Sequence, residues 1–268
     1  MIFKKLIWTL KRHPFLYTTR FKLLSKNSSI EAIENISYND TNGKEEIPSF
    51  FYEINNNIFQ KYEQESELDR VIKLSSWLVD NIKGGKGLSV PSENALKMML
   101  SGEGGVCSDM AQIFNNFCVI NDIKVREWGS TRAPFDESYG GHSFNEVYIK
   151  ELNQWVAIDV SYSTLFYDGQ QNLLSVIQMY QTLRNGGNIQ CNSFNDNVEL
   201  NSSGIEKNYL NLDSVPFLIC NYSNKVYDKY LNAFRPYLPV FLIHFIIYFF
   251  GKSYYYYYPL DDFKKIFS

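Results

Sequence analysis

Apolar residues recur at helical spacing between residues 66 and 120. From 66 to 82 they fall three or four positions apart and two glycines follow, which predicts a helix that ends there. A shorter helix is predicted after Pro91, ended by glycines near residue 104. After Cys107 the spacing i, i+3, i+4, i+7, i+8 is typical of a helix packed into a core, and it puts Cys107 in the first turn; the apolar positions are Met110, Ile113, Phe114, Phe117 and Cys118.

The pattern changes beyond Asp122. Short extended runs at 123–128, 142–149 and 155–160 predict antiparallel strands. Residues 173–183 are predicted to be helical, and the Asn-rich stretches 34–49 and 185–212 to be a linker or irregular surface. Helices followed by antiparallel strands predict an α+β fold.

The organisation predicted from these patterns has three parts: a basic, partly amphipathic N-terminal region and linker (1–60), a core (61–170), and a C-terminal extension (171–268) with an apolar, tyrosine-rich segment. The apolar run 237–250, followed by the tyrosines up to 258, is too short to cross a membrane, because a helix of that length rises about 21 Å against a hydrocarbon core of roughly 30 Å. We expect it to be buried or interfacial.

The N-terminal region is a second segment that could contact a membrane surface. Seven basic residues precede the first acid, Glu31, and aromatic and aliphatic residues lie between them; they are Lys4, Lys5, Lys11, Arg12, Arg20, Lys22 and Lys26. This pattern fits peripheral contact with an anionic membrane and fits a solvated leading segment equally well. A secretory signal is not expected, because Lys5 and Lys11 bracket too short an apolar stretch, so a cytoplasmic protein is expected.

Composition excludes other classes. The net charge of −3 and pI near 5.7 give no general attraction for nucleic acid. The four cysteines, at 107, 118, 191 and 220, have no C-x-x-C pairing and no histidine at metal-ligand spacing, so we expect reduced thiols and no metal or other cofactor.

Cys107, His142 and Asp159 are the candidate catalytic residues. A helix start lowers a thiol pKa, and the glycines before Cys107 leave space for a substrate carbonyl beside the sulfur. The Cys107 backbone N–H would donate to an oxyanion. His142 and Asp159 lie on consecutive predicted strands, and a hairpin loop of two or four residues near 150–153 would put both on one face; an odd loop would separate them.

Three short segments resemble the transglutaminase-like superfamily of papain-like thiol enzymes: Gly105-Val106-Cys107, His142-Ser143-Phe144-Asn145-Glu146-Val147-Tyr148, and Trp155-Val156-Ala157-Ile158-Asp159. The resemblance covers about residues 65–165. It implies that Cys107 attacks an amide or peptide carbonyl, His142 transfers the proton and Asp159 orients the imidazole. Phe144 and Val160 stand where the family commonly has tryptophan and proline. Ser101 stands where papain-like enzymes carry a glutamine oxyanion donor, so no second donor is assigned.

Three functions remain open. The first hypothesis is hydrolysis of an amide or peptide bond through a thioester, with a protein, peptide or small amide as substrate. The alternative is amide-forming acyl transfer onto an amine, acting on a membrane-proximal or surface-polymer precursor. The third is an inactive binding or scaffold protein, against which the intact triad argues. In each case the stretch 185–212 would be able to cover the cleft.

Overall fold

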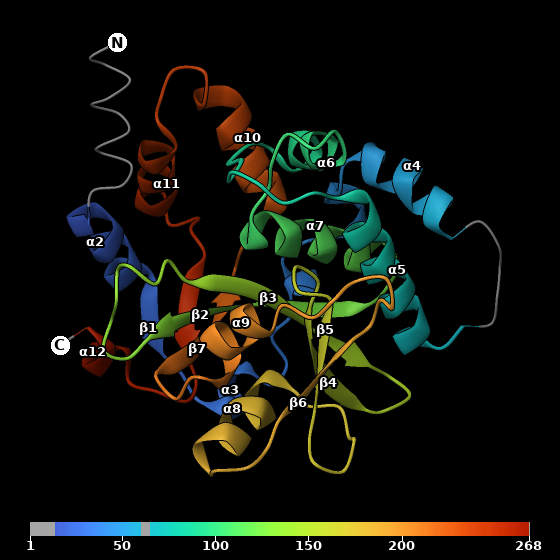
Figure 1. Ribbon diagram of the computed structural model, residues 1–268. Coiled ribbons are helices and arrows are strands. Elements are labelled where there is room, and N and C mark those ends of the chain that lie inside the picture. The colour runs from blue at the N-terminus through green and yellow to red at the C-terminus, as the bar shows by residue number, and fades with distance from the viewer. Residues whose placement is uncertain (1–13, 60–64, 268) are drawn as a thin grey trace.

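A single mixed sheet of eight strands organises the part of the chain that the computed structural model describes, residues 14–59 and 65–267 (Figure 1). The strand order is β1-β8-β7-β2-β3-β4-β5-β6, and all neighbours are antiparallel except β1 and β8. The strands are β1 (Ser25–Asn27), β2 (Lys124–Arg132), β3 (His142–Ile149), β4 (Gln154–Asp159), β5 (Thr164–Tyr167), β6 (Gln190–Ser193), β7 (Ser214–Cys220) and β8 (Tyr255–Tyr258). The predicted α+β fold is confirmed.

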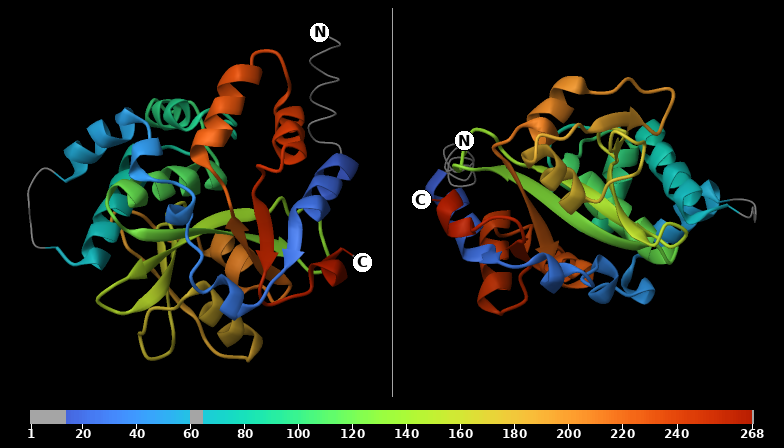
Figure 2. Two further views of the ribbon diagram at one scale, coloured as in Figure 1. Left: turned by 180° about the vertical axis from the view of Figure 1, so that it is seen from behind. Right: turned by 90° about the horizontal axis from the view of Figure 1, so that it is seen from below.

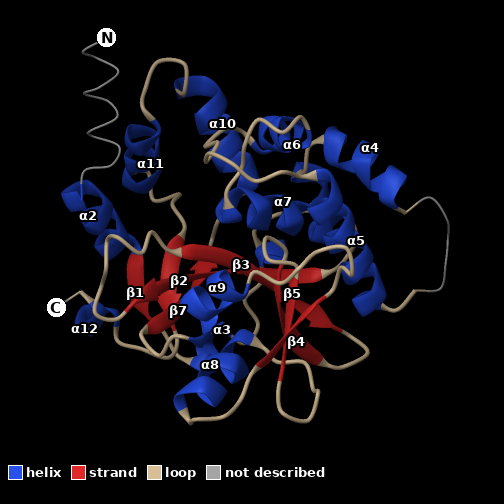
Figure 3. Cartoon of the chain, in the orientation of Figure 1, coloured by secondary structure: helices blue, strands red, loops and turns tan. Residues whose placement is uncertain are grey.

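Helices lie on both faces of this sheet (Figures 1 and 3). The α-helices are α2 (Pro14–Leu24), α3 (Ile30–Ile33), α4 (Ser49–Ile58), α5 (Glu67–Asn81), α6 (Ser92–Leu100), α7 (Cys107–Ile120), α8 (Val176–Arg184), α9 (Ser202–Ile205), α10 (Asn224–Phe234), α11 (Val240–Phe249) and α12 (Phe263–Ile266). Shorter turns are the 3₁₀ helices η1 (Tyr38–Asp40) and η2 (Lys44–Glu46) and the π-helical turn η3 (Glu206–Leu210). The predicted helices at 66–82, 91–100 and after 107, and the three predicted strands, are confirmed within a few residues.

The main core lies between the sheet and helix α7. The apolar side of α7, including Phe114 and Phe117, packs on α4, α5 and α6 and on strand residues such as Val147 and Ile158. From Met110 to Ile120 every side chain of α7 is buried except that of Gln112, ten in all. Burial this deep fixes α7 on the sheet, so its N-terminus, which carries Cys107, has a defined position.

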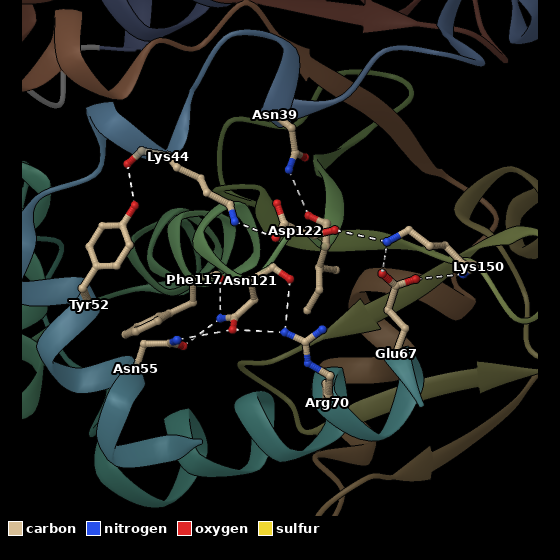
Figure 4. A network of polar contacts seen from close by, with 11 residues as sticks. Asn39, Lys44, Tyr52, Asn55, Glu67, Arg70, Phe117, Asn121, Asp122 and Lys150 are labelled. Atoms are coloured by element: carbon tan, nitrogen blue, oxygen red, sulfur yellow. Dashed lines mark hydrogen bonds and ion pairs between the residues drawn. The ribbon is translucent and has the colours of Figure 1, made fainter. Parts of the chain in front are cut away.

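A polar network holds the other end of α7 (Figure 4). Asn121, the residue after the helix, donates from Nδ2 to Asn55 Oδ1 at 2.7 Å and to the Phe117 carbonyl at 2.8 Å. Arg70 of α5 donates to the Asn121 carbonyl at 3.1 Å. These bonds satisfy carbonyl and amide groups at the helix C-terminus that would otherwise lack partners, and so anchor α7 to α4 and α5.

The second face of the sheet carries an aromatic core. Trp128 and Phe144 of the sheet pack there with Tyr180 of α8 and Tyr209 of η3. Arg126 and Glu146 form a buried ion pair at 2.6 Å beside them. The segment 185–212, predicted to be irregular, therefore contributes a strand, a helical turn and a fully buried tyrosine. Its many asparagines form caps and turns, as Asn201 does at the start of α9.

The N-terminal stretch 34–49 has little regular structure, as predicted, yet it is packed against the core. Tyr38 and Ile47 are buried in the same cluster as α7, and Tyr38 donates a hydrogen bond to Asn116 of that helix at 2.9 Å. Two short 3₁₀ turns carry the chain between these anchors. Much of this predicted linker therefore behaves as part of the core.

Both chain ends join one edge of the sheet. Strand β8 pairs with β7 and with β1, so the tyrosines at 255–258 are residues of the sheet. In α11 only Ile243 and Ile247 are fully buried. No helix among the described residues is long and apolar enough to cross a membrane. Lys4, Lys5, Lys11 and Arg12 of the predicted basic arm lie outside the described residues, as does the predicted boundary at 60–61.

Candidate active site

Cys107 is the first residue of α7, as the sequence predicts. The two glycines before it have φ angles of +143° and +121°, in a region that favours glycine. Gly105 exchanges backbone hydrogen bonds with the 85–86 stretch, donating to the Lys86 carbonyl at 2.8 Å and accepting from Gly85 at 2.7 Å. A Cβ added to Gly104 would lie 2.6 Å from the Lys86 carbonyl oxygen. Glycine is therefore required for the close approach that presents Cys107.

His142 begins β3 and Asp159 ends β4. The connection from 150 to 153 has four residues, and the register pairs Asn145 with Ile158, so the parity predicted to put both side chains on one face is correct. His142 Nε2 lies 2.7 Å from Asp159 Oδ2. A carboxylate only accepts, so Nε2 carries the proton and Nδ1 is the nitrogen available to a thiol.

The three residues come together. Burial raises the pKa of the Cys107 thiol, but the hydrogen bond and charge of His142 and the N–H of Ser143, 3.4 Å from the sulfur, outweigh it and leave this pKa below its ordinary value. Burial lowers the pKa of His142, whereas the charge and hydrogen bond of Asp159 raise it, to about 10 overall. A lowered thiol pKa beside a raised imidazole pKa favours a thiolate–imidazolium pair.

The backbone N–H of Cys107 is available for an oxyanion. It is one of the four N–H groups that a helix start leaves without an intrahelical acceptor, and no described residue accepts from it. Ser101, at the position considered for a second donor, caps α6 and donates to the Met98 carbonyl and to Glu103. Its hydroxyl is therefore engaged away from the thiol.

Two tyrosines that the sequence did not indicate complete the site. Tyr209 of η3 donates from its hydroxyl to Asp159 Oδ2 at 2.7 Å, so this oxygen accepts from both His142 and Tyr209. Tyr162 stacks on the imidazole at 4.7 Å between ring centroids and 10° between planes, and its backbone N–H donates to Asp159 Oδ1 at 3.2 Å. Asn208, next to Tyr209, donates to the Tyr162 hydroxyl at 2.9 Å.

A signal for Tyr162 existed in the sequence, since it lies three residues after Asp159 in the turn that leaves the strand. No such signal existed for Tyr209. It lies 50 residues beyond Asp159, and the extra residue of a π-helical turn is what places Asn208 and Tyr209, adjacent in sequence, both in the interior.

A small cavity of about 150 Å³ opens beside the thiol. Its walls are mostly apolar and include Met99, Met110 and Val160 together with Cys107 itself. Such walls suit an apolar substrate group. Among the described residues, no group of three or more histidine, cysteine, aspartate or glutamate side chains is placed to hold a metal ion.

Comparison with known proteins agrees with this geometry. Residues 52–160 match the family model of the transglutaminase-like superfamily. This part of the chain is a transglutaminase-like domain. The matched range contains Cys107, His142 and Asp159.

More distant comparisons add little to the transglutaminase-like domain. A solved structure of a "putative cysteine protease" from Cytophaga hutchinsonii is similar to part of the chain, with 21% identity and a TM-score of 0.32. The similarity covers 42% of this chain and 37% of that protein, well under half of its length. No curated protein matches the sequence.

The two departures from the family pattern both lie in the site. Phe144, where the family commonly has tryptophan, is buried edge-on to Tyr209, with ring centroids 5.0 Å apart. Val160, in place of the usual proline, is buried and lines the small cavity. Both substitutions keep an apolar side chain, and neither removes a group that would react.

Proposed function

We propose that the protein is a thiol hydrolase that cleaves an amide or peptide bond, with Cys107 as nucleophile, His142 as general base and acid, and Asp159 as the residue that orients the imidazole. The observation that carries the proposal is the 2.7 Å contact between His142 Nε2 and Asp159 Oδ2, which leaves Nδ1 for a thiol whose pKa is below its ordinary value. Side chains that serve only packing do not require this arrangement.

In the proposed reaction, the thiolate of Cys107 adds to the carbonyl carbon, and the Cys107 N–H donates to the developing oxyanion. The C–N bond then breaks, and the imidazolium of His142 gives its Nδ1 proton to the leaving amine. A thioester remains on the sulfur. Water, deprotonated by the now neutral His142, attacks the thioester, and the acid product leaves as the proton returns to the Cys107–His142 pair.

Iodoacetamide labelling of the native protein across pH tests the activated pair. We expect Cys107 to be alkylated faster than the other three thiols, of which the buried Cys118 and Cys220 and the half-buried Cys191 all have pKa values raised by burial. His142→Ala should raise the apparent pKa of the reacting thiol. Slow labelling of Cys107 that is indifferent to His142 would remove the enzymatic proposal and leave a binding or scaffold protein.

Peptide libraries then separate hydrolysis from transfer. Turnover that yields a free carboxylic acid, and that Cys107→Ala abolishes, supports hydrolysis. If product forms only when a primary amine is added, and carries that amine, the alternative of an amide-forming acyl transferase holds instead. The same triad would perform both reactions, because only the second nucleophile differs.

We also propose peripheral contact with an anionic membrane through α11 with the residues that flank it and through the N-terminal region. Tyr237, which precedes α11, is 82% exposed, and Phe249 and Phe250, where α11 ends, are 85% and 60% exposed; Lys252 is two residues further along the chain. Exposed aromatic residues beside basic ones are typical of interfacial surfaces. Co-sedimentation with vesicles containing phosphatidylglycerol, and its loss on Phe249→Ser with Phe250→Ser, would support this; equal binding to neutral and anionic vesicles would contradict the charge contribution.

A further inference from the structure

A second, larger cavity lies between the transglutaminase-like domain and the segments outside it. Its volume is about 340 Å³, within the range of roughly 300–1,000 Å³ for small-molecule sites. One side is formed by the core residues Ser108, Gln112, Glu127 and Ser143. The other side is formed by α2, α10, α11 and β8, through residues that include Arg20, Tyr227, His244, Tyr254 and Tyr256. Figure 2 shows these outer segments gathered at one end of the sheet.

This cavity comes close to the nucleophile through residues next to Cys107, although Cys107 itself does not line it. Ser108 directly follows Cys107, and Ser143 is the residue whose N–H lies 3.4 Å from the Cys107 sulfur. The small apolar cavity lies against the same cysteine through Val106 and Met110. Cys107 is therefore positioned between an apolar space and a polar one, and a bound substrate would extend into both.

Arg20 supplies an uncompensated positive charge to the polar cavity. Its Nη2 donates to the Tyr254 hydroxyl and lies 3.3 Å from His244 Nδ1. Burial, together with the charge of Arg20, holds the pKa of His244 well below its ordinary value, so this imidazole is neutral and accepts the bond. Within the part of the chain whose side chains are described, no carboxylate pairs with Arg20, and Nε and Nη1 have no acceptor. A largely enclosed guanidinium without an anion is costly unless a ligand provides one.

Glu127 supplies a different polar group on the core side. It is 3% exposed and accepts hydrogen bonds at Oε2 from Gln112 and from Asn115, the latter at 3.1 Å. Burial raises its pKa well above the ordinary value, as does the nearby Cys107, which favours the protonated side chain. The carboxylate of Asp109 also lines the cavity, and its Oδ2 accepts from the backbone N–H groups of Val106 and Leu88 at 3.0 and 3.2 Å. Arg20 is therefore the cation of the cavity, and the acidic side chains lie on its core side.

We propose that this cavity is a substrate subsite that binds a carboxylate, so that the enzyme prefers amide-bearing substrates with a free carboxyl group, such as the C-terminal end of a short peptide. Arg20 pairs with the carboxylate, and guanidinium groups bind carboxylates through two parallel N–H donors. The volume limits the bound part to a residue-sized group. The subsite rests on the proposed function, because it selects the substrate of the Cys107 reaction.

Binding is tested first without turnover. The probe pair is N-acetylalanine, which carries an amide and a carboxylate, and N-acetylalaninamide, which is neutral and nearly the same shape. Both are titrated into full-length Cys107→Ala and followed by thermal unfolding. We expect N-acetylalanine to bind at least tenfold more tightly, a difference of about 1.4 kcal/mol, since hydrogen bonds between charged groups are stronger than those between neutral ones.

Variants of α2 test whether Arg20 is responsible for the preference for the acid. Arg20→Gln should bring the affinities for the acid and the amide to within about twofold of each other. Lys22→Gln is the matched control, because it removes the same charge from the same helix at an exposed position that does not line the cavity. Lys22 Nζ donates a hydrogen bond to the Phe267 carbonyl. It should leave the preference for the acid unchanged. Arg20→Lys keeps the charge and serves if Arg20→Gln does not fold; we expect it to retain part of the preference.

The binding measurement tests the subsite independently of the labelling experiment that tests the proposed reaction. Equal binding of acid and amide to the parent protein, or a preference that survives Arg20→Gln, would overturn the subsite whatever Cys107 does. An inert Cys107 in the labelling experiment would overturn the hydrolase, yet the binding measurement would still report whether the cavity takes a carboxylate.

Discussion

Replacing Asp159 with asparagine tests whether charge, rather than shape alone, prepares the thiol. Asp159 is fully buried, and its two oxygens accept from three donors: Oδ2 from His142 Nε2 and the Tyr209 hydroxyl, each at 2.7 Å, and Oδ1 from the Tyr162 N–H at 3.2 Å. An asparagine here has two orientations. With its NH₂ at the Oδ1 position it opposes one donor, and with its NH₂ at the Oδ2 position it opposes two. The first orientation is therefore favoured, and it preserves the Nε2–H tautomer of His142.

The structure gives the size of the effect. The pKa of His142 is raised from 6.5 to about 10, which corresponds to about 5 kcal/mol of preference for the charged imidazole. The charge of Asp159 is the largest of the causes that raise this pKa, while burial acts in the opposite direction. In Asp159→Asn burial remains and the carboxylate is lost, so this pKa should fall towards its ordinary value of 6.5, with only Cys107 still raising it. The thiol of Cys107 then loses its cationic neighbour at neutral pH, and its own pKa should rise.

The assays are an NMR titration and thiol labelling. The chain has three histidines, so the imidazole signals are few and His142→Gln assigns the relevant one. We expect iodoacetamide labelling of Cys107 at pH 7 to fall at least tenfold in Asp159→Asn, since each unit of thiol pKa changes the thiolate fraction about tenfold. Tyr209→Phe, which removes a hydrogen bond to the same oxygen but no charge, is the control and should change labelling much less. A wild-type His142 that titrates near 6.5, or a value unchanged in Asp159→Asn, would refute the reasoning.

Three further predictions concern stability. In a Cys107→Ala background the carboxylate of Asp159 still raises the pKa of His142, so the stabilisation is complete below pH 6.5 and is lost as the pH rises through the folded-state pKa, which lies below the parent's value of about 10 because the Cys107 contribution is gone; urea unfolding across this range should show the loss, and a flat profile would contradict it. Tyr209→Phe should lower the free energy of unfolding by about 1.5–3 kcal/mol, more than Tyr180→Phe, whose hydroxyl donates to a neutral carbonyl; equal losses would mean that the Asp159 charge does not strengthen the bond. Glu146→Gln should cost about 3–5 kcal/mol by leaving Arg126 buried and unpaired, whereas Glu93→Gln on the surface should cost less than about 1 kcal/mol.

The predicted parts of the site are those that local patterns encode. Helix periodicity located the start of α7 and hence Cys107, and hairpin parity placed His142 and Asp159 on one face; both depend only on residues close together in sequence. The register follows from a four-residue connection, which is short enough to infer from the ends of two hydrophobic runs.

The remaining parts depend on contacts between distant segments. Five consecutive tyrosines show no alternation of apolar and polar residues, so the sequence gives no sign that they form strand β8, which is defined by its pairing with β7 and β1. Tyr209 reaches Asp159 through a π-helical turn in an Asn-rich stretch with no helical periodicity. In the sequence Arg20 is one of seven basic residues of the N-terminal region and nothing distinguishes it from the others. Its contact with His244 depends on packing between segments 224 positions apart.

The residues of the proposed reaction and the residues proposed to select the substrate also come from different segments of the chain. The proposed nucleophile, base and orienting carboxylate all come from the transglutaminase-like domain, whereas the cation of the larger cavity and most of its aromatic wall come from segments outside residues 52–160. If those segments only stabilised the fold, a half-buried guanidinium in them would be expected to pair with a protein carboxylate, because an unpaired one costs free energy. Arg20 instead contacts a neutral imidazole and the Tyr254 hydroxyl, beside a cavity whose other side includes Ser108 and Ser143 next to Cys107. That arrangement is the reason to expect that substrate preference in this protein is decided by α2, α11 and β8 rather than by the triad.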